Sequence, residues 1–572
     1  MKKILLCTAL CLFINCKDQK TSISENEKNK LNPSIPRGMI TDNAMVVSAR
    51  IEASKIGTAV MQQGGNAFDA MVATHLALAV AFPVAGNIAG GGFMVYRMND
   101  GSTGGIDFRE KAPLAASKDM YLDKDGNVIK NLSTLGSLAV GVPGSVAGIF
   151  EVHKKFGTLP IEQLVQPAID LATNGVIVTE KQARGLNNLQ ETFIKANKGD
   201  IYFNRTWTAG DTLKQPALAA TLTRIRDQGS DGFYKGKTAD LLVNYLKKLG
   251  GIITKEDLAL YQAKWRDPLT FTYDGNKIIS MSPPSSGGIC LAQILKAIEP
   301  YDIEQYAHNS PQYIQLITEA ERRAYADRAY YLGDPDFVKI PISELMDPQY
   351  LDHRMADFNW DKATPSTSVG HGVIPGYESD ETTHYSIIDS FGNAVSVTTT
   401  LNGGFGSKVY VEEGGFFLNN EMDDFSAKPG EPNMFGLLGA EANAIAPQKR
   451  MLSSMTPTIV EKDGKLKMVL GTPGGSTIIT SVAQNILNVL EYDMGMQESV
   501  NTPRFHHQWL PDEVKFELNF DTSVFAPLEK LGYKIDQSNS RIIGKVDAIL
   551  VLKNGQLEAG ADPRGDDAAA GY

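Results

Sequence analysis

The chain has 572 residues, of which 21% are charged, and a formal net charge of −11 at pH 7. A chain of this length can bury a large core, and its acidic balance argues against a nucleic-acid partner. Of its 4 cysteines only Cys290 lies beyond the N-terminal segment, which excludes an internal disulfide or a thiolate zinc site in the body. Cys290 is expected to be a buried structural thiol.

Residues 1–16 are predicted to be a targeting segment. A basic start precedes an apolar run over 4–14, which is too short to cross a membrane, and the run ends at Cys16. The segment resembles a bacterial lipoprotein signal with lipidation at Cys16, and a plain secretory signal is the alternative. Both predict export, to the periplasm or to the cell envelope with a lipid anchor. Residues 17–36 are polar and predict a flexible tether.

Helical and strand patterns mix throughout the body, which predicts an α/β or α+β fold. Asn66, with Asp69 as its capping-box partner, predicts a buried helix over 67–82. His75 within it is expected to be a hydrogen-bonded core residue. A Ser-Pro start predicts another helix over about 310–331. Runs rich in β-branched residues predict strands over 277–281, 467–470 and 546–552.

The most informative pattern is a hairpin with paired threonines. A strand over 382–389, a turn over 390–393 and a strand over 394–400 place Thr400 and Asn402 near Thr382. Thr382 is a plausible nucleophile that lacks a base, and a cut between Glu381 and Thr382 would supply one as a free amine. A Thr382–His384 pair is conceivable, but His384 is interpreted as structural.

Arg109 lies between acids in the run 107–113, which follows a glycine run at 90–92. No complete phosphate-loop pattern accompanies these glycines, so a nucleotide site is not predicted. Two interpretations of Arg109 stay open. It is either the centre of structural ion pairs or a bidentate clamp for a substrate carboxylate.

Glu421 and Asp424 have the spacing of one helical turn or of a compact loop. A solvated acidic surface is the usual explanation for such a pair. Metal binding is not favoured, because no histidine lies close in sequence and the calcium-loop spacing is absent. Recognition of a substrate ammonium is the third interpretation.

Two short loops complete the candidate residues. Ser453 and Ser454 precede a Thr-Pro turn, where their hydroxyls either cap the turn or bind a carboxylate. Gly474 and Gly475 follow a strand, where glycine N–H groups can form an oxyanion hole or simply a strand-to-helix turn.

Taken together, these motifs resemble one family, the γ-glutamyltransferases (γ-glutamyl transpeptidases) of the N-terminal nucleophile hydrolases. The matching motifs are 64–70, 107–113, 142–144, 283–288, 382–386, 419–425, 452–457, 471–476, 503–509, 562–564 and 571–572. The resemblance therefore covers nearly everything after the tether.

The resemblance implies self-cleavage before Thr382 and a four-layer αββα sandwich built jointly by two chains. The large chain would be 37–381 and the small chain 382–572, packed as a heterodimer. Thr382 would attack the γ-carbonyl of a donor such as glutathione, and the acyl-enzyme would pass to water or to an amino-acid or peptide amine. No metal or organic cofactor is implied.

The family also implies a role for each site residue. Thr400 would orient the nucleophile, and the N–H groups of Gly474 and Gly475 would bind the oxyanion. The donor's α-carboxylate would be held by Arg109, Ser453 and Ser454. Its α-amino group would be held by Asn402, Glu421 and Asp424. Phe435 stands where many members have a lid tyrosine, so the aromatic cover is kept and the phenol hydrogen bond is lost.

Two other functions stay open. A cephalosporin or glutaryl acylase shares the fold and the self-cleavage but needs no ammonium acceptors, so Glu421 and Asp424 favour a γ-glutamyl donor. A lipoprotein that binds peptides or amino acids without turning them over would not need the threonine pair.

Overall fold

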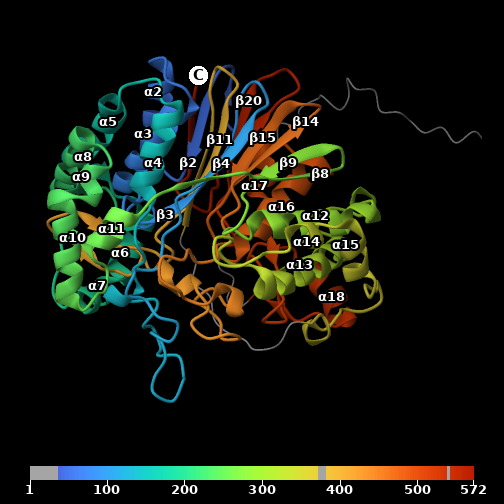
Figure 1. The fold of residues 1–572 in the computed structure, drawn as a ribbon. Coiled ribbons are helices and arrows are strands. Elements are labelled where there is room, and N and C mark those ends of the chain that lie inside the picture. Colours follow the sequence, from blue (N-terminus) through green and yellow to red (C-terminus); the bar gives the residue numbers. More distant parts are fainter. Residues whose placement is uncertain (1–36, 371–381, 538–541) are drawn as a thin grey trace, which may run out of the picture. The chain divides into compact units, whose positions relative to one another are not determined.

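Two seven-stranded sheets lie face to face at the centre of the fold, and within each sheet neighbouring strands are antiparallel (Figure 1). The structure is a computed structural model that describes residues 37–370, 382–537 and 542–572, with Thr382 described through its backbone. The predicted signal with Cys16, the tether and Glu381 lie outside these residues. No helix in the described ranges combines the length and apolar character that crossing a membrane requires.

The first sheet, here called the hairpin sheet, contains the predicted threonine hairpin at its centre. Its strands in spatial order are β21 (Ala568–Gly571), β2 (Met45–Ser48), β10 (Thr382–Ile388), β11 (Ala394–Thr400), β3 (Gly91–Arg97), β4 (Thr103–Asp107) and β7 (Lys264–Arg266).

The second sheet contains the three other predicted strands, each within two residues of its expected bounds. Its order is β1 (Ile40–Thr41), β20 (Leu557–Gly560), β19 (Asp547–Val551), β15 (Lys465–Gly471), β14 (Thr458–Lys462), β9 (Asn276–Ser280) and β8 (Leu269–Tyr273). Smaller sheets are formed by β5 (Val176–Ile177) with β6 (Thr212–Leu213), by β12 (Tyr410–Val411) with β13 (Phe416–Phe417), and by β16 (Phe505–His506), β17 (Val514–Phe516) and β18 (Ile535–Asp536).

Helices cover the outer face of both sheets, so the predicted αββα sandwich is confirmed (Figure 1). On the side of the hairpin sheet lie α2 (Ile51–Gln62), α3 (Ala67–Ala81), α4 (Ser145–Phe156), α5 (Ile161–Asn174), α6 (Glu180–Asn188), α7 (Gln190–Asn197), α8 (Pro216–Gln228), α9 (Asp231–Tyr234), α10 (Gly236–Leu249) and α11 (Lys255–Leu260). On the other side lie α12 (Gly287–Ile298), α13 (Pro311–Tyr331), α14 (Ile342–Leu345), α15 (Pro348–Met355), α16 (Thr477–Leu490), α17 (Met496–Asn501) and α18 (Phe525–Leu531).

Strand β10 divides its side chains between two cores, as the two-residue period of a strand requires. Tyr385 and Ile387 join the core beneath α3. His384 and Ser386 point the other way, towards the second sheet, where Ser386 Oγ donates to the carbonyl of Asp547 at 2.9 Å. The nucleophile strand therefore contacts both layers that flank it.

The helix α3 forms where it was predicted and ends one residue earlier than expected. Asn66 and Asp69 make the reciprocal capping box. His75 is fully buried and bonds through its ring nitrogens to the Tyr385 hydroxyl at 3.0 Å and the Asn87 carbonyl at 3.1 Å. Burial lowers the pKa of His75 to about 4, so it is a neutral core residue, as predicted.

The hairpin turn is tied to the same helix by Asp389. Its Oδ1 accepts from the backbone N–H groups of Phe391 and Asn393 at 3.0 and 2.8 Å, and its Oδ2 accepts from that of Ala67 at 2.8 Å. Because this carboxylate serves the turn, β10 ends at Ile388 and not at residue 389 as expected.

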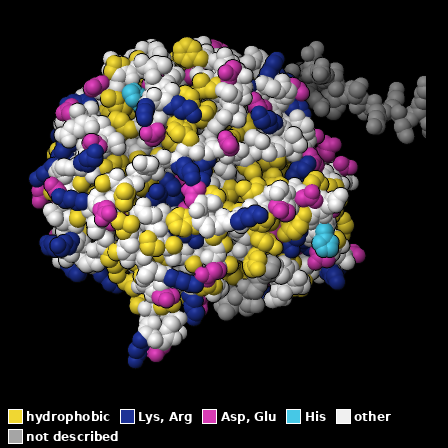
Figure 2. All heavy atoms as spheres, viewed as in Figure 1, with side chains coloured by type: hydrophobic (Ala, Val, Ile, Leu, Met, Phe, Trp, Pro, Cys, Tyr) yellow, Lys and Arg dark blue, Asp and Glu magenta, His cyan; other side chains and the backbone are white. Residues whose placement is uncertain are grey.

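On the face shown in Figure 2, acidic and basic side chains are intermixed among the described residues. No broad field of Lys and Arg is visible on this face. This distribution agrees with the acidic composition of the chain.

Replacing Asp389 with Ala should lower the free energy of unfolding by about 2–4 kcal/mol, because several buried N–H groups lose their acceptor. Urea unfolding followed by tryptophan fluorescence measures the loss. Asp119→Ala, at an exposed position, is the control and should change stability by less than about 0.5 kcal/mol. Equal losses in the two variants would contradict the role given to Asp389.

Candidate functional site

The hairpin places Thr382 directly opposite Thr400 in the β10–β11 register, as predicted. On its other side Thr400 pairs with Gly91 of β3. The Thr400 hydroxyl accepts from the backbone N–H of Asn402 at 2.7 Å, and Asn402 has a left-handed φ of 71° that turns the chain out of the sheet. The end of β11 is therefore held in one conformation beside Thr382.

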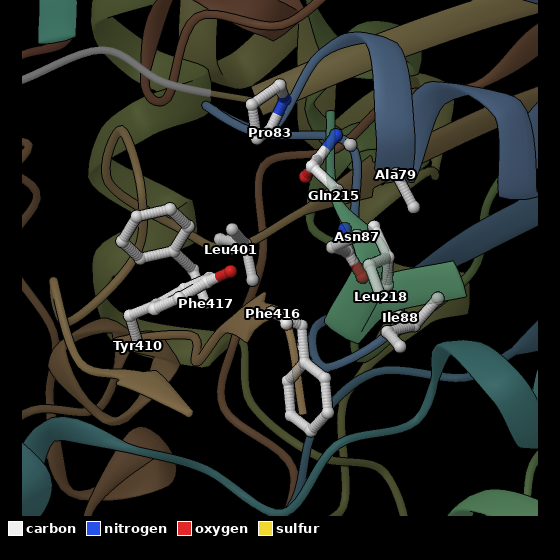
Figure 3. Close-up of a pocket in the computed structure, with 12 residues that line it drawn as sticks. Ala79, Pro83, Asn87, Ile88, Gln215, Leu218, Leu401, Tyr410, Phe416 and Phe417 are labelled. Atoms are coloured by element: carbon white, nitrogen blue, oxygen red, sulfur yellow. The ribbon is translucent and has the colours of Figure 1, made fainter. Parts of the chain in front are cut away.

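Asn87, which no sequence pattern indicated, is hydrogen-bonded to the same end of β11. Its Nδ2 donates to the Thr400 carbonyl at 2.9 Å, and its Oδ1 accepts from the N–H of Gly90 and the hydroxyl of Ser145. Figure 3 shows Asn87 with Leu401 around a cavity of about 10 Å³. That volume holds one water molecule at most, so this cavity is no substrate site.

Arg109 lies two residues beyond β4, is buried, and contacts both predicted carboxylates. Its guanidinium pairs with Glu421 and with Asp424, and it also donates to the carbonyl of Leu452 at 3.2 Å. Glu421 and Asp424 reach it from one short 3₁₀ turn, Glu421–Asp424. In this state Arg109 is the centre of structural ion pairs, and the same atoms are placed to exchange these partners for a ligand.

Glu110 is a further buried acid at this place. It lies 3.8 Å from Arg109 and is completely buried. Burial, and next the charge of Glu421, raise the pKa of Glu110 well above its usual value. Burial therefore disfavours the charged form of Glu110. Its neighbour Arg109 was singled out in the sequence, but only tertiary packing brings Glu110 against Glu421.

The pKa of Glu421 is itself raised to about 7, mainly by burial, against the lowering effect of Arg109 and with a smaller raising effect of Asp424. Burial also raises the pKa of Asp424. The charge of Glu421 therefore changes near neutral pH.

Ser453 and Ser454 line the same cavity as Arg109. Ser453 Oγ accepts from the N–H of Met455 at 3.1 Å and so caps its own turn, and Ser454 Oγ accepts from Arg328 at 3.1 Å. Both predicted interpretations of this loop are compatible with the structure, because the capped turn holds the hydroxyls at the cavity wall.

Gly474 and Gly475 form the turn between β15 and α16, with φ values of 139° and 53°. A Cβ on Gly475 would lie 2.4 Å from the Phe435 ring, and one on Gly474 would lie 2.5 Å from Thr477 Oγ1. Only glycine fits both positions. Among the described residues, none accepts a hydrogen bond from the N–H of Gly474 or Gly475.

Phe435 lines the cavity. Its side chain is buried, and its ring packs over Gly475. The neighbouring Met434 places its sulfur 3.6 Å from Asn402 Nδ2 and 3.5 Å from Asn420 Nδ2. The space left among Arg109, Asn402 and their neighbours is about 20 Å³, so the site is closed in this state.

His384 does not belong to the site. Its ring nitrogens bond to the hydroxyls of Thr398 at 2.9 Å and Ser386 at 3.1 Å, and the ring packs on Gly471. Burial lowers the pKa of His384 to about 3, which agrees with a structural role. In the described ranges, no group of three His, Cys, Asp or Glu side chains is arranged to hold a metal ion.

Comparison with known proteins agrees with this geometry. A family model described as gamma-glutamyltranspeptidase matches residues 53–572. The chain is 46% identical over 533 residues to the glutathione hydrolase proenzyme of Escherichia coli, with 92% of each chain covered.

Two solved structures are similar. The cephalosporin acylase from Bacillus halodurans has a TM-score of 0.84 at 25% identity, covering 94% of this chain and 98% of that chain. The γ-glutamyltranspeptidase of Helicobacter pylori has a TM-score of 0.56 at 44% identity, covering 60% of this chain and 97% of that chain. With the family model spanning nearly the whole body, the chain belongs to the γ-glutamyltranspeptidase family.

Proposed function

We propose that this chain is a self-processing γ-glutamyltransferase that hydrolyses glutathione and related γ-glutamyl donors. One observation supports the proposal most strongly. Residues from five separate segments meet around one cavity whose wall includes Thr400, the partner of Thr382 in the sheet. They are Arg109, Asn402, Glu421 with Asp424, Ser453 with Ser454, and Gly475.

Cleavage between Glu381 and Thr382 would divide the chain into 37–381 and 382–572. The freed amine of Thr382 takes the proton from its own hydroxyl, which attacks the γ-carbonyl and forms an ester. The donor's amine leaves with a proton. Water or the amine of an amino acid or peptide then attacks the ester and releases the γ-glutamyl group. The similar Helicobacter pylori chain matches 60% of this one, about the share that 37–381 makes up, which supports the division.

The oxyanion is assigned to the N–H groups of Gly474 and Gly475. Their N–H groups have no described acceptor, and such preorganised donors stabilise the developing charge. Thr400, opposite Thr382, orients the nucleophile.

The zwitterionic end of the donor would replace the ion pairs at Arg109. Its α-carboxylate would bind Arg109, Ser453 and Ser454. Its α-ammonium would bind Asn402, Glu421 and Asp424. Each protein charge thereby keeps an opposite partner, so entry of the donor leaves no buried charge unpaired. Phe435 must move for this exchange, and without a phenol hydroxyl it lacks one hydrogen bond for closing again.

The acylase alternative is favoured by fold similarity to a cephalosporin acylase. An acyl group without an ammonium would leave Glu421 and Asp424 facing Arg109 alone, as they do in the closed state. The retained acceptors therefore favour the γ-glutamyl donor.

Export is proposed from the N-terminal sequence. A basic start and an apolar run that ends at Cys16 match a lipoprotein signal, with the tether 17–36 carrying the enzyme away from the membrane. The enzyme would act in the periplasm or at the cell envelope.

Thr382→Ala should remain a single inactive chain, because both the cut and the nucleophile are lost. Denaturing electrophoresis and N-terminal sequencing test this. The unmodified protein should give two chains, the smaller starting Thr-Thr-His-Tyr. Full activity in uncut protein would refute the mechanism.

An assay of γ-glutamyl-anilide against glutaryl-anilide decides the substrate class. Release from the γ-glutamyl compound alone is expected, and glycylglycine should accelerate it if transfer occurs. Preference for the glutaryl compound would establish the acylase, and release from neither would leave the non-catalytic binding protein.

The KM for a γ-glutamyl donor should rise as the pH falls below about 7. Glu421, with a pKa of about 7, becomes protonated there and ceases to accept the ammonium as a charged partner. The rise should be at most about tenfold per pH unit.

Glu421→Gln should remove this pH dependence of KM. The dependence of kcat on the Thr382 amine, with an ordinary pKa of about 8, should persist in that variant. A KM profile that is the same in both proteins would show that another group titrates.

A further inference from the structure

A second and larger cavity has a volume of about 360 Å³. This is the size of a small-molecule site. It shares no lining residue with the Arg109 cavity. It is bounded by the segment that follows α3, by α6 and by the C-terminal loop that precedes β21.

The lining combines an apolar wall with an excess of positive charge. The apolar wall includes Phe82, Pro83, Val84, Leu186 and Phe405. The charged lining residues are Lys181, Arg184, Lys545, Arg564 and a single acid, Asp566. In a chain of net charge −11, this local excess of cations selects an anionic ligand.

Among the described residues of the lining, Arg184 differs from the other cations. Arg564 is committed to Glu517 at 2.6 Å, and Lys181 bonds to the carbonyl of Gly565. Arg184 lies exposed on α6, and no hydrogen bond or ion pair joins it to any described residue.

Two of the segments that carry site residues are hydrogen-bonded to the lining of this cavity. Phe405, three residues after Asn402, donates its N–H to the Val84 carbonyl at 2.7 Å. Lys545 donates its N–H to Thr472 Oγ1 at 2.7 Å, just before the two site glycines. Two hydrogen bonds therefore connect the lining of the cavity to segments that carry site residues.

A γ-glutamyl donor has two ends. With its α-end at Arg109 and its γ-carbonyl at Thr382, the group on the amine side of the scissile bond must extend away from the Arg109 cavity. We propose that the second cavity binds this amine-side partner, a short peptide whose free carboxylate meets Arg184. The partner is either the leaving peptide of the donor or the acceptor peptide. This inference rests on the proposed function.

The test compares peptides with and without the carboxylate in Arg184→Glu, Arg184→Lys and the unmodified enzyme. For the acceptor, KM values for glycylglycine and glycylglycinamide are measured with γ-glutamyl-anilide as donor. For the leaving peptide, KM values for glutathione and its glycinamide form are measured in hydrolysis. Lys154→Glu, exposed on α4 away from the lining, is the matched charge-reversal control.

Arg184→Glu should raise KM for the carboxylate form by about tenfold relative to the amide form, and Arg184→Lys should keep most of the preference. A change confined to glycylglycine assigns the cavity to the acceptor, and one confined to glutathione assigns it to the leaving peptide. An unchanged ratio in both arms, with the protein cut normally into two chains, overturns the proposal.

Failure of the proposed function has a different signature. The unmodified protein would then release nothing from γ-glutamyl-anilide. In that case calorimetric titration with glycylglycine tests the cavity alone. Binding that Arg184→Glu abolishes supports the cavity, and binding that is absent or unaffected overturns it.

Discussion

The pairing of Thr382 with Thr400 is the constraint on which the rest of the site depends. A slip of one residue would turn every side chain of the strand to the other face of the sheet. The register is held at both ends, by Asp389 at the turn and by Asn87 behind Thr400. A chain end created at Thr382 would therefore begin in a strand whose position neighbouring elements have already set.

The second constraint is the balance of buried charge around Arg109. One guanidinium faces Glu110, Glu421 and Asp424, and all four groups are largely removed from water. Buried ions of this kind are costly unless each has a partner, and burial together with the charge of Glu421 raises the pKa of Glu110, which disfavours a third negative charge here. A ligand with both a carboxylate and an ammonium preserves this balance. A ligand with one of them disturbs it, which gives the site a physical basis for choosing α-amino acids.

Both constraints apply in the closed state, in which the Arg109 cavity has a volume of about 20 Å³. Phe435, which lines the Arg109 cavity, packs on Gly475 in the turn assigned to the oxyanion. In the proposed binding mode, the two ends of a donor meet surfaces of different character, one zwitterionic and one apolar with cations.

Local sequence patterns were sufficient to predict the elements named above and to indicate most site residues. Capping chemistry predicted α3, turn residues and β-branched runs predicted the hairpin, and the register followed from the turn, because these signals are local. The family resemblance added the roles of Arg109 and the glycines, and the αββα layers. Only the tertiary structure decided which residues of distant segments contact one another. It paired Arg109 with Glu421, buried Glu110 against them and joined Asn87 to Thr400. It also left Arg184 beside a cavity with no partner among the described residues. Such contacts join residues hundreds of positions apart, where neither periodicity nor spacing along the chain carries information about distance.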